Sequence, residues 1–245
     1  SPGRLLFVRD DTLMAQGFDA GTLALTGDAV PVGEDLRNSY GFSASRDGTL
    51  IYLTAGGSKG QHTWFDRQGK TLGTVGRVGQ AFLDGMRVST DGTRLAASRR
   101  EQGSRPDIWV VDLVQGAETR LTTDPASDSL PVWSPEGSRI AFQSDREGTT
   151  NLYVRAADGA GRDELLLQTG ERKAPLDWSR DGRFLLFGVL TAKSTDIWVL
   201  QMEAGPGGER KPVPYLRTDA NEAAARFSPD GRFAVSGSRD TTLKV

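Results

Sequence analysis

Short apolar runs separated by polar turns make up nearly the whole 245-residue chain. Segments such as RIAFQS at 139–144 and FLLFGVL at 184–190 combine aliphatic, β-branched and aromatic residues, and clusters of Gly, Asp and Ser flank them. This pattern predicts many short strands joined by tight turns. Helical periodicity is nearly absent, and its best candidate, NEAAARF at 221–227, is too short and runs into a predicted strand. We therefore expect an all-β protein.

A Ser-x-Asp/Glu-Gly tetrapeptide recurs along the chain with a nearly constant step. It begins at Ser45, Ser89, Ser134, Ser179 and Ser228. The steps between these serines are 44, 45, 45 and 49 residues. A second marker, an aromatic residue inside a strand-like run, keeps the same phase at Trp64, Trp109, Tyr153 and Trp198. Two independent markers in phase indicate a repeat protein.

One repeat unit can be read from residues 131–170, PVWSPEGSRIAFQSDREGTTNLYVRAADGAGRDELLLQTG. It contains four strand-like runs joined by turns rich in Gly, Asp and Pro. Four short strands repeated every ~45 residues are typical of the blade of a β-propeller. We expect Trp133, Trp178 and Phe227, each directly before a turn serine, to pack between blades. The outermost strand of the fifth unit is KPVPYLRT, whose two prolines suit a sheet edge.

The repeat predicts a single propeller domain over residues 1–245 with about six blade positions. Their approximate bounds are 1–39, 40–80, 81–124, 125–170, 171–219 and 220–245. The first and last positions each offer three strands, which is too many for one shared four-stranded closing blade. We therefore expect two incomplete blades and a chain that is part of a longer protein, because an open strand edge is prone to association.

The composition narrows the classes of partner. The chain has 30 basic and 32 acidic residues, so we expect neither nucleic acid nor an anionic membrane as a partner. Its longest apolar run, at 184–190, is far shorter than the ~18 residues of a membrane span, so no direct membrane insertion is expected. The chain begins with Ser-Pro and shows no secretory signal, so any targeting segment is expected to have been removed. With no cysteine, it offers no disulfide and no thiolate metal site.

No catalytic motif stands in a suitable context. GGSKG at 56–60 fits the Gly-x-Ser-x-Gly nucleophile pattern, but a strand-like run follows Ser58 where a helix is required, so a hairpin turn is favoured. His62 is the only histidine and cannot form a zinc site alone. A carboxylate site for calcium stays open, although no Asp-x-Asp-x-Asp loop is present. Kinase catalytic motifs are absent too, and we expect no catalytic residue, cofactor or metal in this chain.

The connections that enter the innermost strands are the best candidates for a binding site. They carry Asp84, Asp128, Arg172, Lys173, Asn221 and Glu222. In a propeller these connections gather at one mouth of the central channel, where loops from several blades commonly bind ligands. We expect a protein, peptide or small-molecule ligand at this mouth. For any single one of these residues, the alternative is an ordinary solvated loop position.

The repeats resemble those of TolB-type propellers, also called WD-like propellers, over residues 40–235. The resemblance rests on FSPDGRF, VWSPEGSRIAFQSDREGTTNLYV and LDWSRDGRFLLF. The two ends, GRLLFVRDDTLMAQGFDAGTLALTGDAVPV and DIWVLQMEAGPGGERKPVPYLRTDANEAAARFSPDGRF, look like the propeller that follows the kinase domain in many bacterial, notably acidobacterial, serine/threonine kinases. The final SGSRDTTLKV instead looks like a WD-repeat blade, which either a continuing WD-type propeller or a divergent last blade would explain.

The resemblance implies three functions. The first is a non-catalytic sensor or interaction module, as the extracytoplasmic part of a receptor-like serine/threonine kinase. The second is a TolB-like periplasmic scaffold that binds a protein or peptide. The third is enzymatic: a carboxylate-based hydrolase or lyase at the channel, or the accessory propeller of a prolyl-oligopeptidase-type hydrolase whose catalytic domain would lie elsewhere. An extracytoplasmic location follows from the first two, and a cytoplasmic one stays open.

Overall fold

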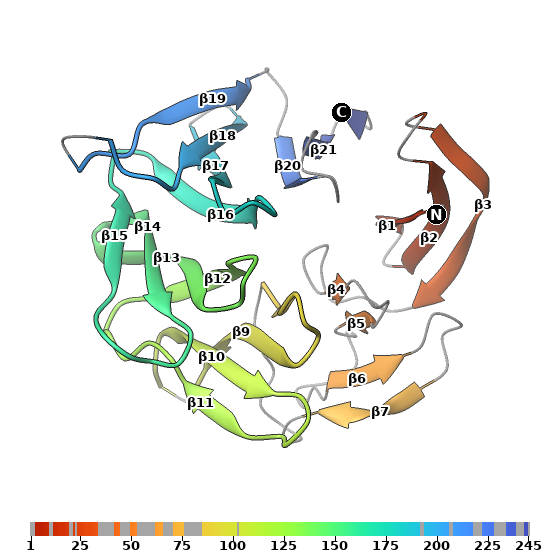
Figure 1. Ribbon diagram of the computed structural model, residues 1–245, viewed down its shortest axis with the longest axis horizontal. Helices are drawn as coiled ribbons and strands as arrows, with labels where there is room; N and C mark the ends of the chain where they lie inside the picture. The colour runs from red at the N-terminus through yellow and green to blue at the C-terminus, as the bar shows by residue number, and fades with distance from the viewer. Residues whose placement is uncertain are drawn as a thin grey trace.

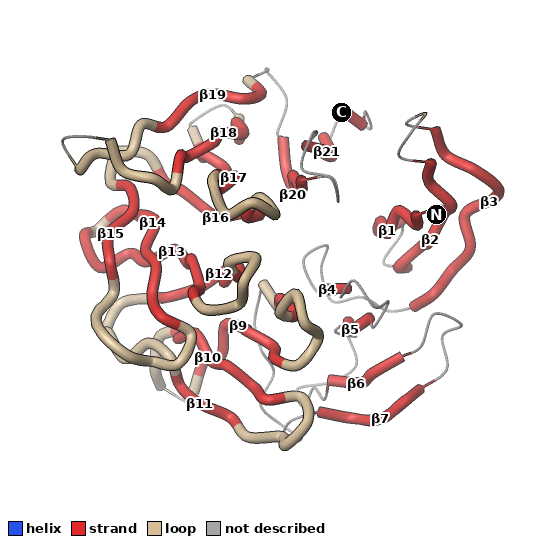
Figure 2. Tube along the Cα trace, in the orientation of Figure 1, coloured by secondary structure: helices blue, strands red, loops and turns tan. Residues whose placement is uncertain are grey.

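The computed structural model consists of strands and connections, with no helix among the residues it describes (Figure 2). The described residues are 3–9, 12–19, 22, 24–33, 42–44, 50–52, 62–65, 71–75, 85–101, 103–191, 194–205, 208–217, 222–227, 234–238 and 243–244. Every strand pairing between them is antiparallel, as expected when consecutive strands are joined by short turns. The prediction of an all-β protein is therefore confirmed.

Six sheets are formed by consecutive strands of the described chain. The first has β1 (Gly3–Arg9), β2 (Thr12–Asp19) and β3 (Ala24–Gly33). The second has β4 (Phe42–Ala44), β5 (Leu50–Tyr52), β6 (His62–Phe65) and β7 (Thr71–Val75). The third has β8 (Arg87–Val88), β9 (Arg94–Arg100), β10 (Pro106–Asp112) and β11 (Glu118–Arg120).

The second half of the ring repeats this plan. The fourth sheet has β12 (Asp128–Trp133), β13 (Arg139–Glu147), β14 (Thr149–Ala156) and β15 (Glu164–Leu167). The fifth has β16 (Arg172–Trp178), β17 (Phe184–Leu190), β18 (Thr195–Gln201) and β19 (Pro212–Leu216). The sixth has β20 (Glu222–Phe227), β21 (Ala234–Ser238) and β22 (Leu243–Lys244).

The sheets stand in a ring, with β4, β12 and β16 nearer the centre and β7, β15 and β19 on the outside (Figure 1). This is the arrangement of a β-propeller in which each sheet is one blade. Among the described residues, the first and last sheets have three strands each and do not merge into one blade, as the sequence predicts. The proline-containing strand β19 lies at the outer edge of its sheet, again as predicted.

The repeated tetrapeptide forms the turn between the first and second strands of a sheet. In the fifth sheet, the Asp181 carboxylate accepts hydrogen bonds from the Ser179 hydroxyl at 2.7 Å and the Arg183 N–H at 3.1 Å. The Ser179 hydroxyl oxygen in turn accepts the Phe184 N–H at 2.8 Å. Gly182 adopts a φ of 75°, which other residues rarely adopt. The turn at Ser89 repeats this pattern, so the motif is recurrent because it closes a turn.

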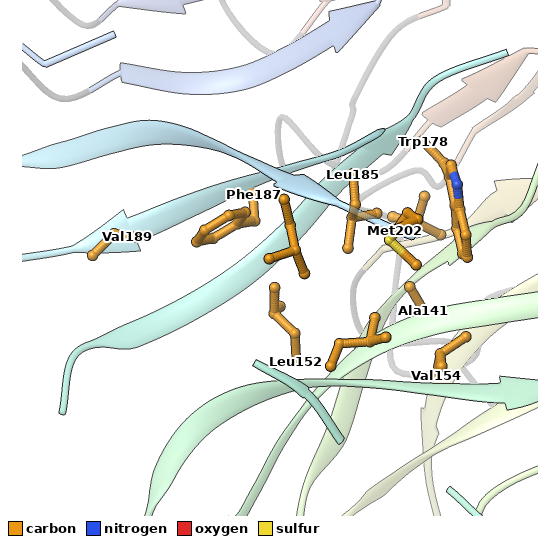
Figure 3. Packing of buried hydrophobic residues seen from close by; sticks show 11 residues of the cluster. Ala141, Leu152, Val154, Trp178, Leu185, Phe187, Val189 and Met202 are labelled. Atoms are coloured by element: carbon orange, nitrogen blue, oxygen red, sulfur yellow. The ribbon is translucent and has the colours of Figure 1, made fainter. Parts of the chain in front are cut away.

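The core lies between neighbouring sheets. Between the fourth and fifth sheets, Leu152 and Val154 pack against Leu185 and Phe187, and all four are almost fully buried (Figure 3). Trp178 borders the same cluster, and its indole N–H donates to the Gly182 carbonyl oxygen at 3.1 Å.

Trp133 packs with the third sheet in a second cluster. Phe227, half-buried, packs with Leu176 and Leu186 of the fifth sheet in a third. The aromatic residues before the turn serines therefore pack between blades, as predicted.

Candidate functional site

The structure describes four of the six residues predicted at the channel rim; Asp84 and Asn221 lie outside the described residues. Asp128, Lys173 and Glu222 occupy one repeated position, six residues before the turn serine, in β12, β16 and β20. The side chains of all three are buried, with at most 2% exposed. Arg172 is the exposed member among the described four.

Asp128 is held by an arginine of its own sheet. The Arg146 guanidinium donates to both carboxylate oxygens of Asp128, at 3.2 and 3.3 Å, and to Asp163 at 2.8 Å. Arg146 also lies over the ring of Tyr153, with 4.3 Å between the guanidinium carbon and the ring centroid. Burial raises the pKa of Asp128 above its usual value, although the Ser144 hydroxyl and Arg146 counteract it.

Lys173 joins two sheets. Its ammonium group donates to the Asn151 side-chain oxygen of β14 at 3.1 Å and to the Glu171 carbonyl oxygen at 2.6 Å. Its N–H donates to the Thr150 hydroxyl at 3.2 Å. Burial lowers the pKa of Lys173 below its usual value. Asp128 and Lys173 are thus buried and make contacts within and between sheets.

A different repeated position brings charged side chains together. This axial position lies two residues before each turn serine, on the strand nearest the centre of the ring. Its occupants are Ser43, Arg87, Val132, Asp177 and Arg226. The charged residues in RVS, DWS and RFS, at a constant distance from the serine, are the sequence signal for this position, which the expected rim residues do not include.

Asp177 and Arg226 join the fifth and sixth sheets at this position. The Asp177 carboxylate accepts the N–H of Phe227 at 2.8 Å. The Arg226 guanidinium donates to the carbonyl oxygen of Leu176, next to Asp177, and to that of Ala225 at 2.9 Å. Burial raises the pKa of Asp177, while the positive charges of Arg226 and Arg87 act in the opposite direction.

Arg87 approaches the same place from the third sheet. Its guanidinium donates to the Met86 carbonyl oxygen at 2.8 Å, and its own carbonyl oxygen accepts the indole N–H of Trp133 at 2.8 Å. Arg87 holds the axial position of the third sheet, and its positive charge acts against the raised pKa of Asp177. We call Arg87, Asp177 and Arg226 the axial cluster; each is half-buried.

A shallow cavity of about 360 Å³ lies between two neighbouring turns. Pro135, Glu136, Arg180, Asp181 and Gly182 line it. The Ser179 hydroxyl hydrogen bond keeps the pKa of Asp181 below its usual value, so this carboxylate is ionised at neutral pH. The same bond fixes it within its own turn.

The described part of the chain contains no group of three or more His, Asp or Glu side chains that could hold a metal ion. Ser58 lies outside the described residues, and His62 begins the strand β6, which pairs with β7. Among the described residues, no helix is long and apolar enough to cross a membrane.

The TolB beta propeller domain family matches residues 83–245, which is more than half of the chain. The chain belongs to this family. The Tol-Pal system protein TolB of Helicobacter pylori (strain J99) is 30% identical to it over 146 residues, covering 59% of the chain and 34% of the relative. The uncharacterized peptidase YuxL of Bacillus subtilis is 32% identical over 114 residues, covering 44% and 17%. The TolB-family chain thus spans about a third or less of the length of these relatives.

A solved structure shows the same fold over nearly the whole chain. The putative TolB from Agrobacterium tumefaciens superposes with a TM-score of 0.69 and 21% identity, covering 96% of this chain and 87% of that one. At this level of identity the likeness supports the fold alone. It confirms the predicted propeller beyond the residues that the family match covers.

Proposed function

We propose that this TolB-family propeller is a non-catalytic interaction module that binds a protein, peptide or small molecule on its axis. The observation that carries the proposal is the axial cluster: hydrogen bonds at Asp177 and Arg226 join the fifth and sixth sheets, and Arg87 holds the same repeated position in the third sheet. Ligand sites in ring-shaped folds commonly form where elements from several repeats converge. Together with the rim residues, of which Arg172 is exposed, the cluster would define the mouth and the floor of one site.

The repeat itself supports a binding role over a catalytic one. The Ser and Asp side chains that recur most often are engaged in closing turns, at 2.5 Å between Ser89 and Asp91 and 2.7 Å between Ser179 and Asp181. A nucleophile or general base needs a partner aimed at a substrate rather than at its own turn. Partner binding also agrees with the relatives named for the Tol-Pal system.

More specifically, we propose that the chain is the extracytoplasmic sensor of a receptor-like serine/threonine kinase, which is the finer form of the proposal. Its support is the resemblance of the two ends to the propellers of such kinases. The complete reading frame tests it: the finer form requires a kinase domain and a membrane span upstream. A frame that lacks both removes the kinase assignment and leaves a TolB-like periplasmic scaffold.

A second candidate function is that of an accessory propeller in a peptidase. The likeness to YuxL, named as a peptidase, favours it. The peptidase chemistry would then reside outside this chain. Peptide hydrolysis by the full-length protein, lost on mutation of a serine in another domain, would support this candidate over the scaffold.

Site-directed photo-crosslinking tests the binding role. A photoreactive residue at Arg172 should capture a discrete partner from the source bacterium's envelope fraction. The control is the same residue at Val114, which is 82% exposed in the turn between the outer strands β10 and β11. Capture at Arg172 alone agrees with a site at the mouth. Equal labelling at both positions, or none at either, would contradict the proposal.

A further inference from the structure

The first sheet matches the outer three strands of a four-stranded blade. The run LLF occurs in β1 at 5–7 and in β17, the second strand of the fifth sheet, at 185–187. The next strand of each sheet places an aliphatic residue opposite the residue after this run, and these two residues, Leu13 and Ile197, are both 0% exposed. The strands β1, β2 and β3 therefore correspond to β17, β18 and β19, and no described strand of the first sheet corresponds to the innermost strand β16.

The core beside the first sheet lacks the contribution of an innermost strand. In the fifth sheet, Leu186 and Ile197 form a cluster that also contains Leu176 of the innermost strand β16. Their equivalents in the first sheet, Leu6 and Leu13, belong to a cluster with residues of the second sheet. Among the described residues of the first sheet, none occupies the position of Leu176 in this cluster.

The apolar run of β1 can therefore be reached by a ligand. The side chains of the run 185–187 are at most 1% exposed, whereas the equivalent side chains at 5–7 are all half-buried. The strand β1 lies nearer the centre of the ring than β2 and β3 (Figure 1), and its described pairing is with β2 alone. An apolar strand edge of this kind offers main-chain N–H and C=O groups to an added strand.

The innermost strands of the other sheets show which chemistry fits such an edge. Each of them pairs antiparallel to the second strand of its sheet. The residue directly before the turn serine is aromatic in the fourth, fifth and sixth sheets, as Trp133, Trp178 and Phe227. The residue three before the serine is apolar, as Pro131, Leu176 and Ala225.

A charge on β1 adds a further requirement. Arg9 stands two residues after the run 5–7, where the fourth sheet has Ser144 opposite Asp128 and the fifth has Val189 opposite Lys173. The Arg9 side chain is exposed, and it lies over the Phe7 ring of its own strand at 5.3 Å. Opposite charges attract across paired strands, so an acidic residue, as in the fourth sheet, fits opposite Arg9 better than a lysine does.

We propose that the inner edge of β1 binds an extended segment of a partner protein as an added antiparallel strand. The segment carries an acidic residue opposite Arg9, an apolar residue three positions later and an aromatic residue two positions after that. A folded second copy of the chain is disfavoured, because the other sheets place a single strand on this inner side. The inference goes beyond the proposed function, since it places a partner on the first sheet rather than at the axial cluster.

Fluorescence anisotropy with a labelled peptide SDSLPVWS, the sequence of residues 127–134, tests the inference on the 245-residue chain. Arg9→Glu should weaken binding about fivefold, because attraction across the two strands becomes repulsion. The matched control is Arg4→Glu, which reverses the same charge on an exposed side chain at the other end of β1 and should change binding less than about twofold. A larger loss at Arg4 than at Arg9 would overturn the proposed orientation.

Changes in the peptide keep the test valid even if a chain variant fails to fold. A peptide with lysine in place of its aspartate should bind the wild type about fivefold more weakly and regain affinity for Arg9→Glu. Neighbouring residues of a strand direct their N–H groups to opposite sides. Methylation of the amide nitrogen of the aspartate or of the serine after it should therefore abolish binding in one case only. Equal effects of the two methylated peptides would contradict strand addition.

Hydrogen exchange distinguishes the occupants of the edge. The peptide should slow exchange of the β1 amides that point away from β2 and leave the outer strand β3 unchanged. Protection of these β1 amides without peptide would overturn the inference, by another segment of the chain if the protein is a monomer in sedimentation and by a second copy if it is a dimer. If Arg172 captures a partner while the peptide does not bind, the proposed function stands and this inference fails.

Discussion

At the scale of single residues, most buried charged groups in the described part of this propeller have a partner of opposite charge or a set of polar atoms. Arg146 is the clearest case, because it contacts Asp128 and Asp163 and lies over the Tyr153 ring. Exposure falls from 16% for the Arg146 side chain to 10% for Asp163 and 0% for Asp128. Burying such charged groups costs free energy, which their mutual interactions offset. Removing one partner is strongly destabilising because the remaining charge is then buried without compensation.

Arg146→Met should therefore lower the free energy of unfolding strongly, by about 3–5 kcal/mol, because two buried carboxylates lose their cation. Urea denaturation measures the change. In the double variant Arg146→Met/Asp128→Asn, one of these carboxylates is also gone, so the loss should be clearly smaller than the sum of the single effects. Additive effects would mean that Arg146 and Asp128 do not stabilise each other.

The buried side chain of Lys173 should make the free energy of unfolding depend on pH. Burial lowers the pKa of Lys173 in the folded chain, while the unfolded chain keeps the usual value of about 10.4. Between those two pKa values the unfolded state binds a proton that the folded state has released, so the free energy of unfolding rises with pH. Relative to Lys173→Gln, the wild type should thus gain stability as the pH rises through alkaline values toward the usual lysine pKa of about 10.4.

Urea denaturation at several pH values measures this difference between the wild type and Lys173→Gln. Lys211→Gln, which changes an exposed lysine just before β19, controls for the loss of one positive charge. A difference that stays constant or falls over this range would show that the hydrogen bonds to Asn151 and Glu171, rather than burial, set the pKa of Lys173.

At the scale of elements, neighbouring blades are matched to each other in side-chain type. The residue five after a turn serine meets the residue before the next turn serine: Arg94 lies over Trp133 at 4.7 Å, and Arg139 over Trp178 at 5.2 Å. In the fifth sheet the first of these positions is Phe184, and the next blade carries Phe227. Where the first position is an arginine, the next blade thus offers a tryptophan, the ring that binds cations best. Where the first position is a phenylalanine, the next blade offers another phenylalanine.

Replacing the glycine of one turn tests whether this residue is required there for its backbone conformation. Gly182→Ala should lower the free energy of unfolding by about 1–2 kcal/mol, because a φ of 75° brings a Cβ atom too close to its own backbone. Crowding is not the reason, since a Cβ there would lie 3.7 Å from Pro135 Cγ, an ordinary contact.

Gly170→Ala is the matched control for urea denaturation. It lies between β15 and β16, where no positive φ applies and no atom is within 4 Å of the added Cβ. A similar loss of stability in both variants would show that general helix or strand preferences, rather than the left-handed backbone of the turn, explain the effect.

The sequence predicted the elements well because their signals are local. Turn serines, acidic residues and glycines at fixed spacing specify hairpins wherever they occur, and the strands between them follow. The candidate site was harder to predict because it depends on which side chains the ring brings together. Proximity to a loop pointed to Asp128 and Lys173, which the structure buries, whereas the axial cluster is spread over about 140 residues.

At the scale of the whole molecule, stability resides in interfaces between adjacent sheets. The described core divides into separate clusters, of which one joins the fourth and fifth sheets and another joins the first and second. Each blade contacts its neighbours, much as units of a repeat protein do. A disturbance at one interface should therefore affect the two flanking blades before it affects the rest of the ring.

Two matched substitutions on opposite sides of the ring test this view. Leu152 and Leu13 are both 0% exposed, the first in the cluster of the fourth and fifth sheets and the second in that of the first and second. Replacing either with alanine leaves a cavity and should cost about 2–5 kcal/mol. In native-state hydrogen exchange, Leu152→Ala should reduce protection most in β12–β19, and Leu13→Ala most in β1–β3 and β5. An equal loss of protection in all described strands for both variants would show that the ring opens as one cooperative unit. In that case a ligand at the axis, which touches three sheets at once, would stabilise every blade to the same extent.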